Sequence, residues 1–172
     1  MIAYADGAPE DGPDLDPVAR QCWIDTFAHS CSAEDMAAYL GQAYGPNGAL
    51  LRHLADPANH RFRIAREREA VIGYAKLSTP WLPPEYVGPR ARQLSQLYVV
   101  RQKQGTGIAQ ALMDWTIASA RESGSDELLL TVWEENHRAQ RFYRRYGFDH
   151  IGDYAFQTGA QIDRDLIFRL AL

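Results

Sequence analysis

Two glycines between an apolar run and a helical segment are the first residues in this chain whose spacing suggests chemistry. They lie in Gln104-Gly105-Thr106-Gly107-Ile108-Ala109, directly after the β-type run Leu97-Tyr98-Val99-Val100. Glycines let the backbone approach a phosphate closely, and the first N–H groups of a helix have no partner inside it. The helix dipole adds about half a positive charge at the same end. The pattern predicts a turn that binds a pyrophosphate.

Other kinds of glycine loop fit this segment less well. A P-loop would end in Gly-Lys-Ser or Gly-Lys-Thr, and the dinucleotide fingerprint would need glycine at position 110, where this chain has Gln110. A plain glycine-containing turn between a strand and a helix is the remaining alternative.

Tyr143 is the second residue with chemical potential, because its hydroxyl could donate a proton. Ala139, Phe142, Tyr143 and Tyr146 are spaced i, i+3, i+4 and i+7, so Tyr143 could equally be only a core aromatic. Asn136 lies seven residues before it, which is about 10.5 Å along one helical face. Asn136 could equally cap that helix.

Together these segments resemble the Gcn5-related N-acetyltransferase (GNAT) superfamily. The glycine turn is similar to its coenzyme A signature: Gln or Arg, two residues, Gly, one residue, Gly or Ala. The pattern fits from Gln104 and also from Gln102; the first register keeps the family's spacing from the strand to the turn. The run from Asn136 to Phe148 resembles the second motif, in which an Asn opens the helix and the Tyr of a Phe-Tyr pair is the general acid.

The resemblance implies direct acetyl transfer from acetyl-CoA to a primary amine in a ternary complex. Such a reaction forms an oxyanion and expels a thiolate, so it needs an N–H donor and a proton source. By the resemblance, the backbone of Val99 or Val100 is the donor, where the fourth strand parts from the fifth, and Tyr143 is the proton source. The residues expected to contact acetyl-CoA are Leu97, Val99, Val100, Gln104, Gly105, Thr106, Gly107, Ile108, Ala109, Asn136 and Tyr143.

The base that takes the proton from the incoming ammonium is less defined by the sequence. Glu134, with Glu135 beside it, ends the predicted fifth strand and is the candidate catalytic base. Tyr98 and an ordered water are the alternatives. Charged residues at a strand end are usually only solvated.

The flanks narrow the resemblance to polyamine acetyltransferases of the PaiA type. Residues 25–27 and 32–44 resemble the amino-terminal region of those enzymes, and residues 156–165 resemble their carboxyl-terminal hairpin. A polyamine such as spermidine is polycationic, so its site should contain carboxylates. The alternatives are a lysine or amino-terminal amine of a protein or peptide, and a module that binds acetyl-CoA without catalysis. The acidic candidates are Asp25, Glu34, Asp35, Glu134 and Glu135.

The elements that must position these residues follow from hydrophobic periodicity. Together with the resemblance, they indicate an α/β fold of the GNAT type, with a mixed, mostly antiparallel sheet of six or seven strands and helices on both faces. The strands are expected at 1–4, 60–67, 70–77, 92–100, 128–133, 151–156 and 165–170, and the helices at 17–27, from about Ser32, and at 49–54, 107–123 and 137–146.

Composition limits the remaining possibilities. The length of 172 residues with 46% hydrophobic content suits one domain, residues 1–172. The net charge of -4 and scattered basic residues disfavour nucleic acid as a partner. No stretch approaches the roughly 20 apolar residues of a membrane span, and no leader is evident, so a cytoplasmic protein is expected. The histidines lack metal-ligand spacing, so no metal is expected, and Cys22 and Cys31 read as reduced thiols. A homodimer is compatible with the sequence.

Overall fold

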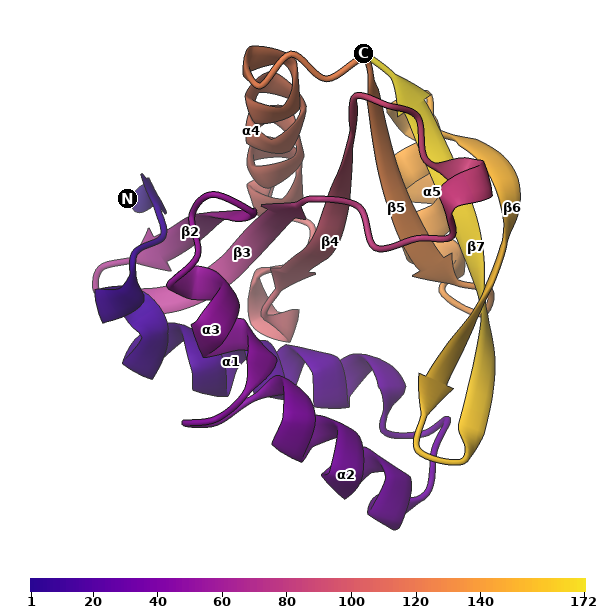
Figure 1. The fold of residues 1–172 in the computed structure, drawn as a ribbon. Coiled ribbons are helices and arrows are strands. Elements are labelled where there is room, and N and C mark those ends of the chain that lie inside the picture. Colours follow the sequence, from indigo (N-terminus) through magenta and orange to yellow (C-terminus); the bar gives the residue numbers. More distant parts are fainter.

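The computed structural model describes all residues from 1 to 172 and contains one sheet of seven strands (Figure 1). The order across the sheet is β1-β2-β3-β4-β5-β7-β6. Every neighbouring pair is antiparallel except β4 and β5, which are parallel. The predicted mixed, mostly antiparallel sheet is therefore confirmed. The strands are β1 (Ile2–Asp6), β2 (His60–Glu67), β3 (Ala70–Ser78), β4 (Ala91–Val99), β5 (Glu127–Trp133), β6 (Asp149–Thr158) and β7 (Gln161–Ala171).

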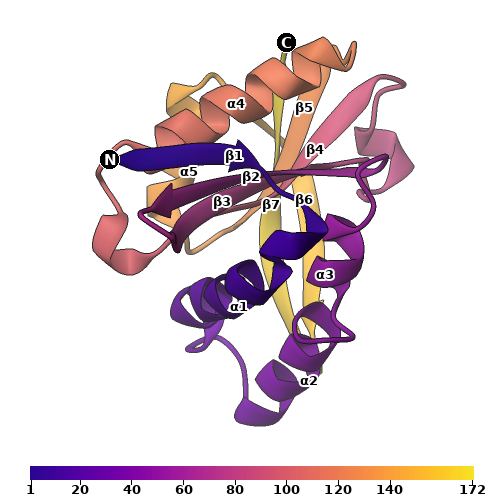
Figure 2. The ribbon, with the colours of Figure 1, turned by 90° about the vertical axis from the view of Figure 1, so that its left-hand side faces the viewer.

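Helices cover both faces of the sheet, as predicted. Helices α1, α2 and α3 lie on one face, and α4 and α5 lie on the other (Figure 2). None of the helices is both long and apolar enough to cross a membrane. The helices are α1 (Gly12–Phe27), α2 (Ala33–Ala43), α3 (Ala49–Leu54), α4 (Ile108–Glu122) and α5 (His137–Arg145), and the three 3-10 turns are η1 (Pro9–Asp11), η2 (Pro84–Tyr86) and η3 (Arg101–Lys103).

Strand β5 shows why both faces of the sheet can be covered. Its continuous apolar run places Leu128 and Leu130 against α4 and α5, whereas Leu129 faces the opposite side. All three side chains are buried. A strand without polar alternation needs cover on both sides. Helices α4 and α5 cover one side, and Leu82 with residues around η2 covers the Leu129 side.

Helix α1 begins at Gly12 rather than at the predicted Pro17. Gly, Pro and Asp residues are typical of turns, but Pro13 here occupies the first turn of a helix, where a missing N–H costs nothing. Arg66 on β2 forms ion pairs with Asp11 at 2.9 Å and with Asp14 at 3.1 Å. These contacts with a distant strand stabilise the early start.

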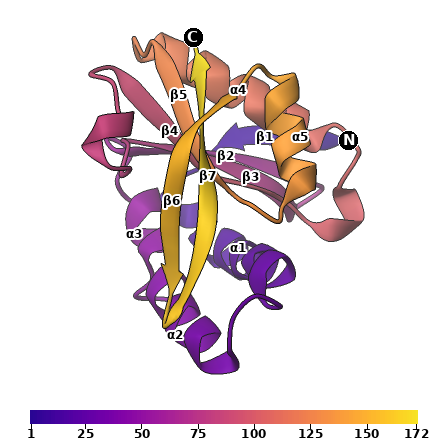
Figure 3. The same ribbon diagram turned by 90° about the vertical axis from the view of Figure 1, so that its right-hand side faces the viewer.

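The β6–β7 hairpin is longer than predicted and reaches α2 (Figure 3). Pairing continues to Thr158 and Gln161, next to the turn. There the Ala160 N–H donates to the Asp35 carboxylate at 2.8 Å. Asp35 also lies in the first turn of α2, whose N-cap is Ser32, as predicted. The Asp35 side chain thus joins α2 to the turn between β6 and β7.

Strands β4 and β5 pair along only part of their length. The parallel pairing covers Ala91–Gln93 and Glu127–Leu129 and then stops. Beyond it, Ser95 is an extra residue on β4 that has no partner on β3, which makes a β-bulge. A bulge bends its strand and increases the local twist. The two strands consequently diverge, and Figure 1 shows them separating toward the side of α1 and α2.

We expect Gly73→Ala to disturb the position of β4. A Cβ at Gly73 would lie 2.8 Å from the Tyr98 carbonyl oxygen and 3.3 Å from Val99 Cγ2, so β3 and β4 would have to separate. The free energy of unfolding from urea denaturation should fall by about 1–3 kcal/mol. Gly41→Ala is the matched control, because nothing lies within 4 Å of its Cβ and it is inside α2. That change should stabilise by about 0.5–1 kcal/mol. Equal effects of the two changes would contradict the close approach.

Candidate active site

The opening between β4 and β5 exposes backbone groups of β4. The Val100 N–H donates to the Ile72 carbonyl at 3.0 Å. Because hydrogen bonding alternates along an antiparallel pair, the N–H groups of Leu97 and Val99 point away from β3 and into the opening. No strand pairs with them there. These N–H groups are free to bind a ligand.

The backbone of Val100 was expected to contact a ligand, but its hydrogen-bonding groups are used within the protein. Its N–H is used by β3, and its carbonyl accepts the Lys103 N–H at 2.9 Å. Both of its backbone groups are therefore engaged within the protein. The candidate oxyanion donor narrows from Val99 or Val100 to Val99.

The glycine turn lies at the end of β4 and leads directly into α4. Gly105 and Gly107 have φ values of 83° and 88°, which glycine adopts without the strain that other residues incur. The N–H groups of Gly105, Thr106 and Gly107 make no backbone hydrogen bond. Helix α4 begins at Ile108, so its unpartnered N–H groups point to the same place. This is the arrangement expected for binding phosphate.

Gln104 connects the turn to two other elements. Its Nε2 donates to the Val99 carbonyl at 3.1 Å, and its Oε1 accepts from the Arg138 guanidinium. Sequence reasoning missed Arg138, which brings a cation from α5 to the glycine turn. Arg138 lies in the segment from Asn136 to Phe148 that resembles the second family motif. Its spacing does not indicate a contact with Gln104, which lies 34 residues away in the chain.

Tyr143 combines a packed ring with an unused hydroxyl. The side chain is 9% exposed and belongs to the apolar cluster that includes Val132 of β5, with Leu97 and Val99 of β4 against it. Burial alone raises the pKa of Tyr143 above its ordinary value, and no hydrogen bond contributes. Burial also raises the pKa of Tyr98, and the nearby Tyr143 phenol adds to that rise. Tyr143 therefore lies beside the opening as a protonated phenol at neutral pH.

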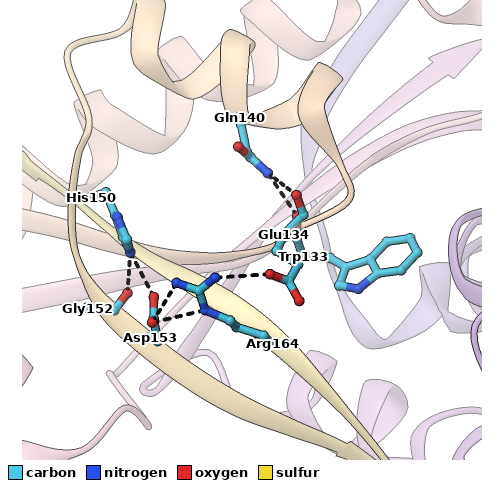
Figure 4. Close-up of polar contacts among 7 residues, drawn as sticks. All are labelled: Trp133, Glu134, Gln140, His150, Gly152, Asp153 and Arg164. Atoms are coloured by element: carbon cyan, nitrogen blue, oxygen red, sulfur yellow. Dashed lines mark hydrogen bonds and ion pairs between the residues drawn. The ribbon is translucent and has the colours of Figure 1, made fainter.

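Helix α5 is fixed to the end of β5 by two side chains. The Asn136 side chain accepts the Ala139 N–H at 3.1 Å, so it caps the helix, which is the alternative that the sequence left open. The Gln140 side chain donates to the carbonyls of Trp133 at 3.2 Å and Glu134 at 2.7 Å (Figure 4). These contacts set the position from which Tyr143 projects.

Glu134, the expected base, lies in a surface ion-pair network. Its carboxylate contacts the Arg164 guanidinium at 3.1 Å (Figure 4). Arg164 also pairs with Asp153 at 2.8 Å, and Asp153 contacts His150 at 2.9 Å. A carboxylate already held by a guanidinium is poorly placed to receive an ammonium. The geometry does not support Glu134 as the base.

Asp165 is a candidate residue that sequence reasoning missed. It is 8% exposed and lies on β7 directly opposite Trp133 of β5. It forms none of the ion pairs of the structure. Burial raises the pKa of Asp165 to about 6, a hydrogen bond from Thr131 opposes the rise, and the Asp163 carboxylate adds to it. The available signal was an acidic residue at the start of the apolar run Leu166-Ile167-Phe168.

Two aromatic residues lie near this carboxylate, Trp133 across β5 and β7 and Tyr39 on α2, and each packs against a further ring. The Trp133 ring lies 5.8 Å from that of Phe27 at the end of α1. The Tyr39 ring of α2 lies 5.9 Å from that of Phe156 on β6. Burial raises the pKa of Tyr39 to about 12, and the Asp165 carboxylate adds to the rise, so the two side chains are close. We call Asp165 and these four rings the acidic aromatic patch.

The structure contains neither a cluster of metal-binding side chains nor a disulfide bond. No group of three or more His, Cys, Asp or Glu side chains is placed to hold a metal ion. Cys22 and Cys31 are both free, and burial raises the pKa of the Cys22 thiol to about 11.

Comparison with known proteins points to one family. The model of the acetyltransferase (GNAT) family matches residues 17–148. An uncharacterized N-acetyltransferase of Mycobacterium tuberculosis is 30% identical over 157 residues, which cover 91% of this chain and 95% of that protein. The N-alpha-acetyltransferase RimI of the same organism is 28% identical over 139 residues, covering 81% and 83%. The crystal structure of PaiA N-acetyltransferase from Thermoplasma acidophilum in complex with coenzyme A has a TM-score of 0.79 at 21% identity, covering 100% and 99%.

We expect Asp165→Asn to raise the free energy of unfolding more at pH 7 than at pH 4. The folded-state pKa is about 6 and the ordinary value is 3.8, so the folded state holds its proton more tightly. Stability of the native chain therefore falls as the pH rises from about 4 to 6, by up to about 3 kcal/mol, and the Asn variant lacks this loss. Urea denaturation at both pH values measures it.

Asp153→Asn is the matched control on the same hairpin. The hydrogen bond from Arg164 lowers the pKa of Asp153, so this carboxylate stabilises the fold above its ordinary pKa and loses that effect in acid. The Asp153 variant should lose stability at pH 7 relative to pH 4, opposite in sign to the Asp165 variant. The same sign for both would contradict a buried, unpaired Asp165.

Proposed function

The chain belongs to the acetyltransferase (GNAT) family, and from that premise we propose that its acceptor is a small cationic amine, a polyamine such as spermidine. Family membership makes it an acetyl-CoA-dependent N-acetyltransferase. The acceptor and the roles of individual residues are the proposal. The single observation that carries these roles is the free Tyr143 hydroxyl beside the opening between β4 and β5.

The residues at the opening fit acetyl-CoA. The pyrophosphate is an anion, and the glycine turn offers the unpartnered N–H groups of Gly105, Thr106 and Gly107. Arg138 adds a cation beside the turn. The pantetheine arm contains amides, which suit the free N–H groups along β4. The PaiA structure, which has the same fold, contains coenzyme A.

Acetyl-CoA supplies an acetyl group activated as a thioester. The Val99 N–H is placed to stabilise the oxyanion that forms when the amine attacks, since it points into the opening. Tyr143 is placed to donate a proton to the departing thiolate, since its high pKa keeps it protonated and no protein group uses its hydroxyl. The acceptor attacks as a neutral amine after its ammonium has lost one proton to water, and the proton that leaves the nitrogen as the amide forms restores the Tyr143 hydroxyl. The apolar cluster around Tyr143 limits water at the reacting sulfur.

Two observations bear on the acceptor. The segments that resemble PaiA-type enzymes at both ends of the chain are joined by the hydrogen bond from Ala160 to Asp35, so they form one wall of the acceptor side. The likeness to RimI favours a second candidate, the α-amino group of a peptide. Either acceptor presents a protonated amine to the same side of the sheet.

Tyr143→Phe should lower kcat by roughly 10²-fold or more, because the thiolate would leave without a proton donor. The measurement is thiol release from acetyl-CoA with spermidine. Tyr146→Phe is the control from the same helix, because its hydroxyl is bound to Asp114 at 3.0 Å and to the Gln110 carbonyl. Turnover that survives in the Tyr143 variant would remove Tyr143 from this role. Turnover with a peptide amine and none with spermidine would replace the polyamine by the second candidate.

Gly107→Ala should raise the KM for acetyl-CoA about tenfold. Its φ of 88° strains any other residue by about 1–2 kcal/mol, and relief of that strain would turn the N–H groups away from the phosphates. Gly124→Ala carries the same kind of strain, at φ 78° with open space around its Cβ, after the far end of α4. It should leave KM unchanged. Equal effects on KM would show that the turn does not bind phosphate.

A further inference from the structure

Asp165 has no protein partner that accounts for its charge. The side chain is more than nine-tenths buried, and no Lys, Arg or His forms an ion pair with it. A buried carboxylate without a cation is costly, and proteins keep such groups mainly at functional sites. Thr131, on the same face of β5, supplies only a hydroxyl. A cation is the partner that would offset its charge.

The position of Asp165 relates it to the opening. Trp133, its direct neighbour across β5 and β7, ends the strand that borders the opening. Both side chains point to the same face of the sheet, toward the end of α1, because residues directly opposite in an antiparallel pair share a face. This is the face opposite Tyr143, which lies with α4 and α5. An amine bound at Asp165 would therefore approach the opening from the side away from the proton donor.

We propose that Asp165 binds the ammonium group of the acceptor and that the acidic aromatic patch selects a primary alkylammonium. The inference rests on the proposed acetyl transfer and specifies how its acceptor is recognised. The rings of Trp133, Phe27, Tyr39 and Phe156 give an alkyl chain apolar contact and stabilise its positive charge through their faces.

Three of the other acidic candidates already have a partner within the protein. Glu134 pairs with Arg164. The Asp35 carboxylate accepts the Ala160 N–H with Oδ1 and the Ser32 hydroxyl with Oδ2, so both of its oxygens are engaged within the protein. Asp25 is exposed and accepts from Gln21. Asp165 is the acidic residue among these that is both buried and free of a charged partner.

Charges around Asp165 determine how binding depends on pH. Asp163 on the same strand is the nearest second carboxylate, Thr131 faces it from β5, Tyr39 from α2, and Tyr154 lies opposite on β6. The His29 ring lies beside Trp133, with ring centres 5.3 Å apart. Above a pH of about 6 the Asp165 carboxyl is ionised, so ammonium binding should strengthen as the pH rises through that value.

The test compares Asp165→Asn with Asp153→Asn in the full chain. Steady-state kinetics with spermidine and acetyl-CoA should give an acceptor KM at least tenfold higher for the Asp165 variant, with the KM for acetyl-CoA unchanged. The Asp153 variant, whose carboxylate pairs with Arg164 on the outer surface, should keep both values. An unchanged acceptor KM in the Asp165 variant overturns the proposal.

A binding measurement separates this proposal from the proposed function. Calorimetry with spermidine, propylammonium and a peptide with a free amino terminus, each with coenzyme A present, reports ammonium binding without turnover. Binding to the native chain that is lost in the Asp165 variant supports the anchor, even if only the peptide is acetylated. Equal binding to both proteins, or no binding of any of these amines to the native chain, overturns it.

Discussion

The hydrogen bonds that β4 and β5 do not make with each other are the constraint on which the site depends. Backbone N–H groups inside a protein need acceptors, and the pairing of these strands stops after Gln93 and Leu129. The bulge at Ser95 bends β4 away, so the N–H groups of Leu97 and Val99 face an opening instead of a neighbouring strand. The glycine turn and α5 lie beside the same opening. A ligand with amides and phosphates can satisfy all of these donors together.

Two buried polar side chains lie on opposite faces of the sheet at this opening. Tyr143 and Asp165 are each about nine-tenths buried, and neither has a charged partner. Burial shifts the pKa of both upward, which keeps the phenol protonated and makes ionisation of the carboxyl costly. Such groups reduce the stability of the fold. In the proposed reaction, one face of the sheet handles the thioester and the other handles the amine.

The surrounding polar residues mostly serve to hold elements in place. Asn136 and Gln140 fix α5 to the end of β5, Arg164 joins β7 to Glu134 and Asp153, and Asp35 joins α2 to the β6–β7 turn. These contacts fix the elements that border the opening. Rigid elements with a supporting set of hydrogen bonds are what a precise arrangement of catalytic groups requires.

Local patterns in the sequence by themselves determined the elements and the glycine turn. Apolar periodicity, the Ser32 cap and the left-handed glycines act within a few residues, so the sheet, the helices and the start of α4 could be predicted. The early start of α1, the engagement of Val100, the ion pair of Glu134 and the isolation of Asp165 could not. Each depends on contacts between residues far apart in the chain, and only the tertiary structure decides which buried polar group obtains a partner.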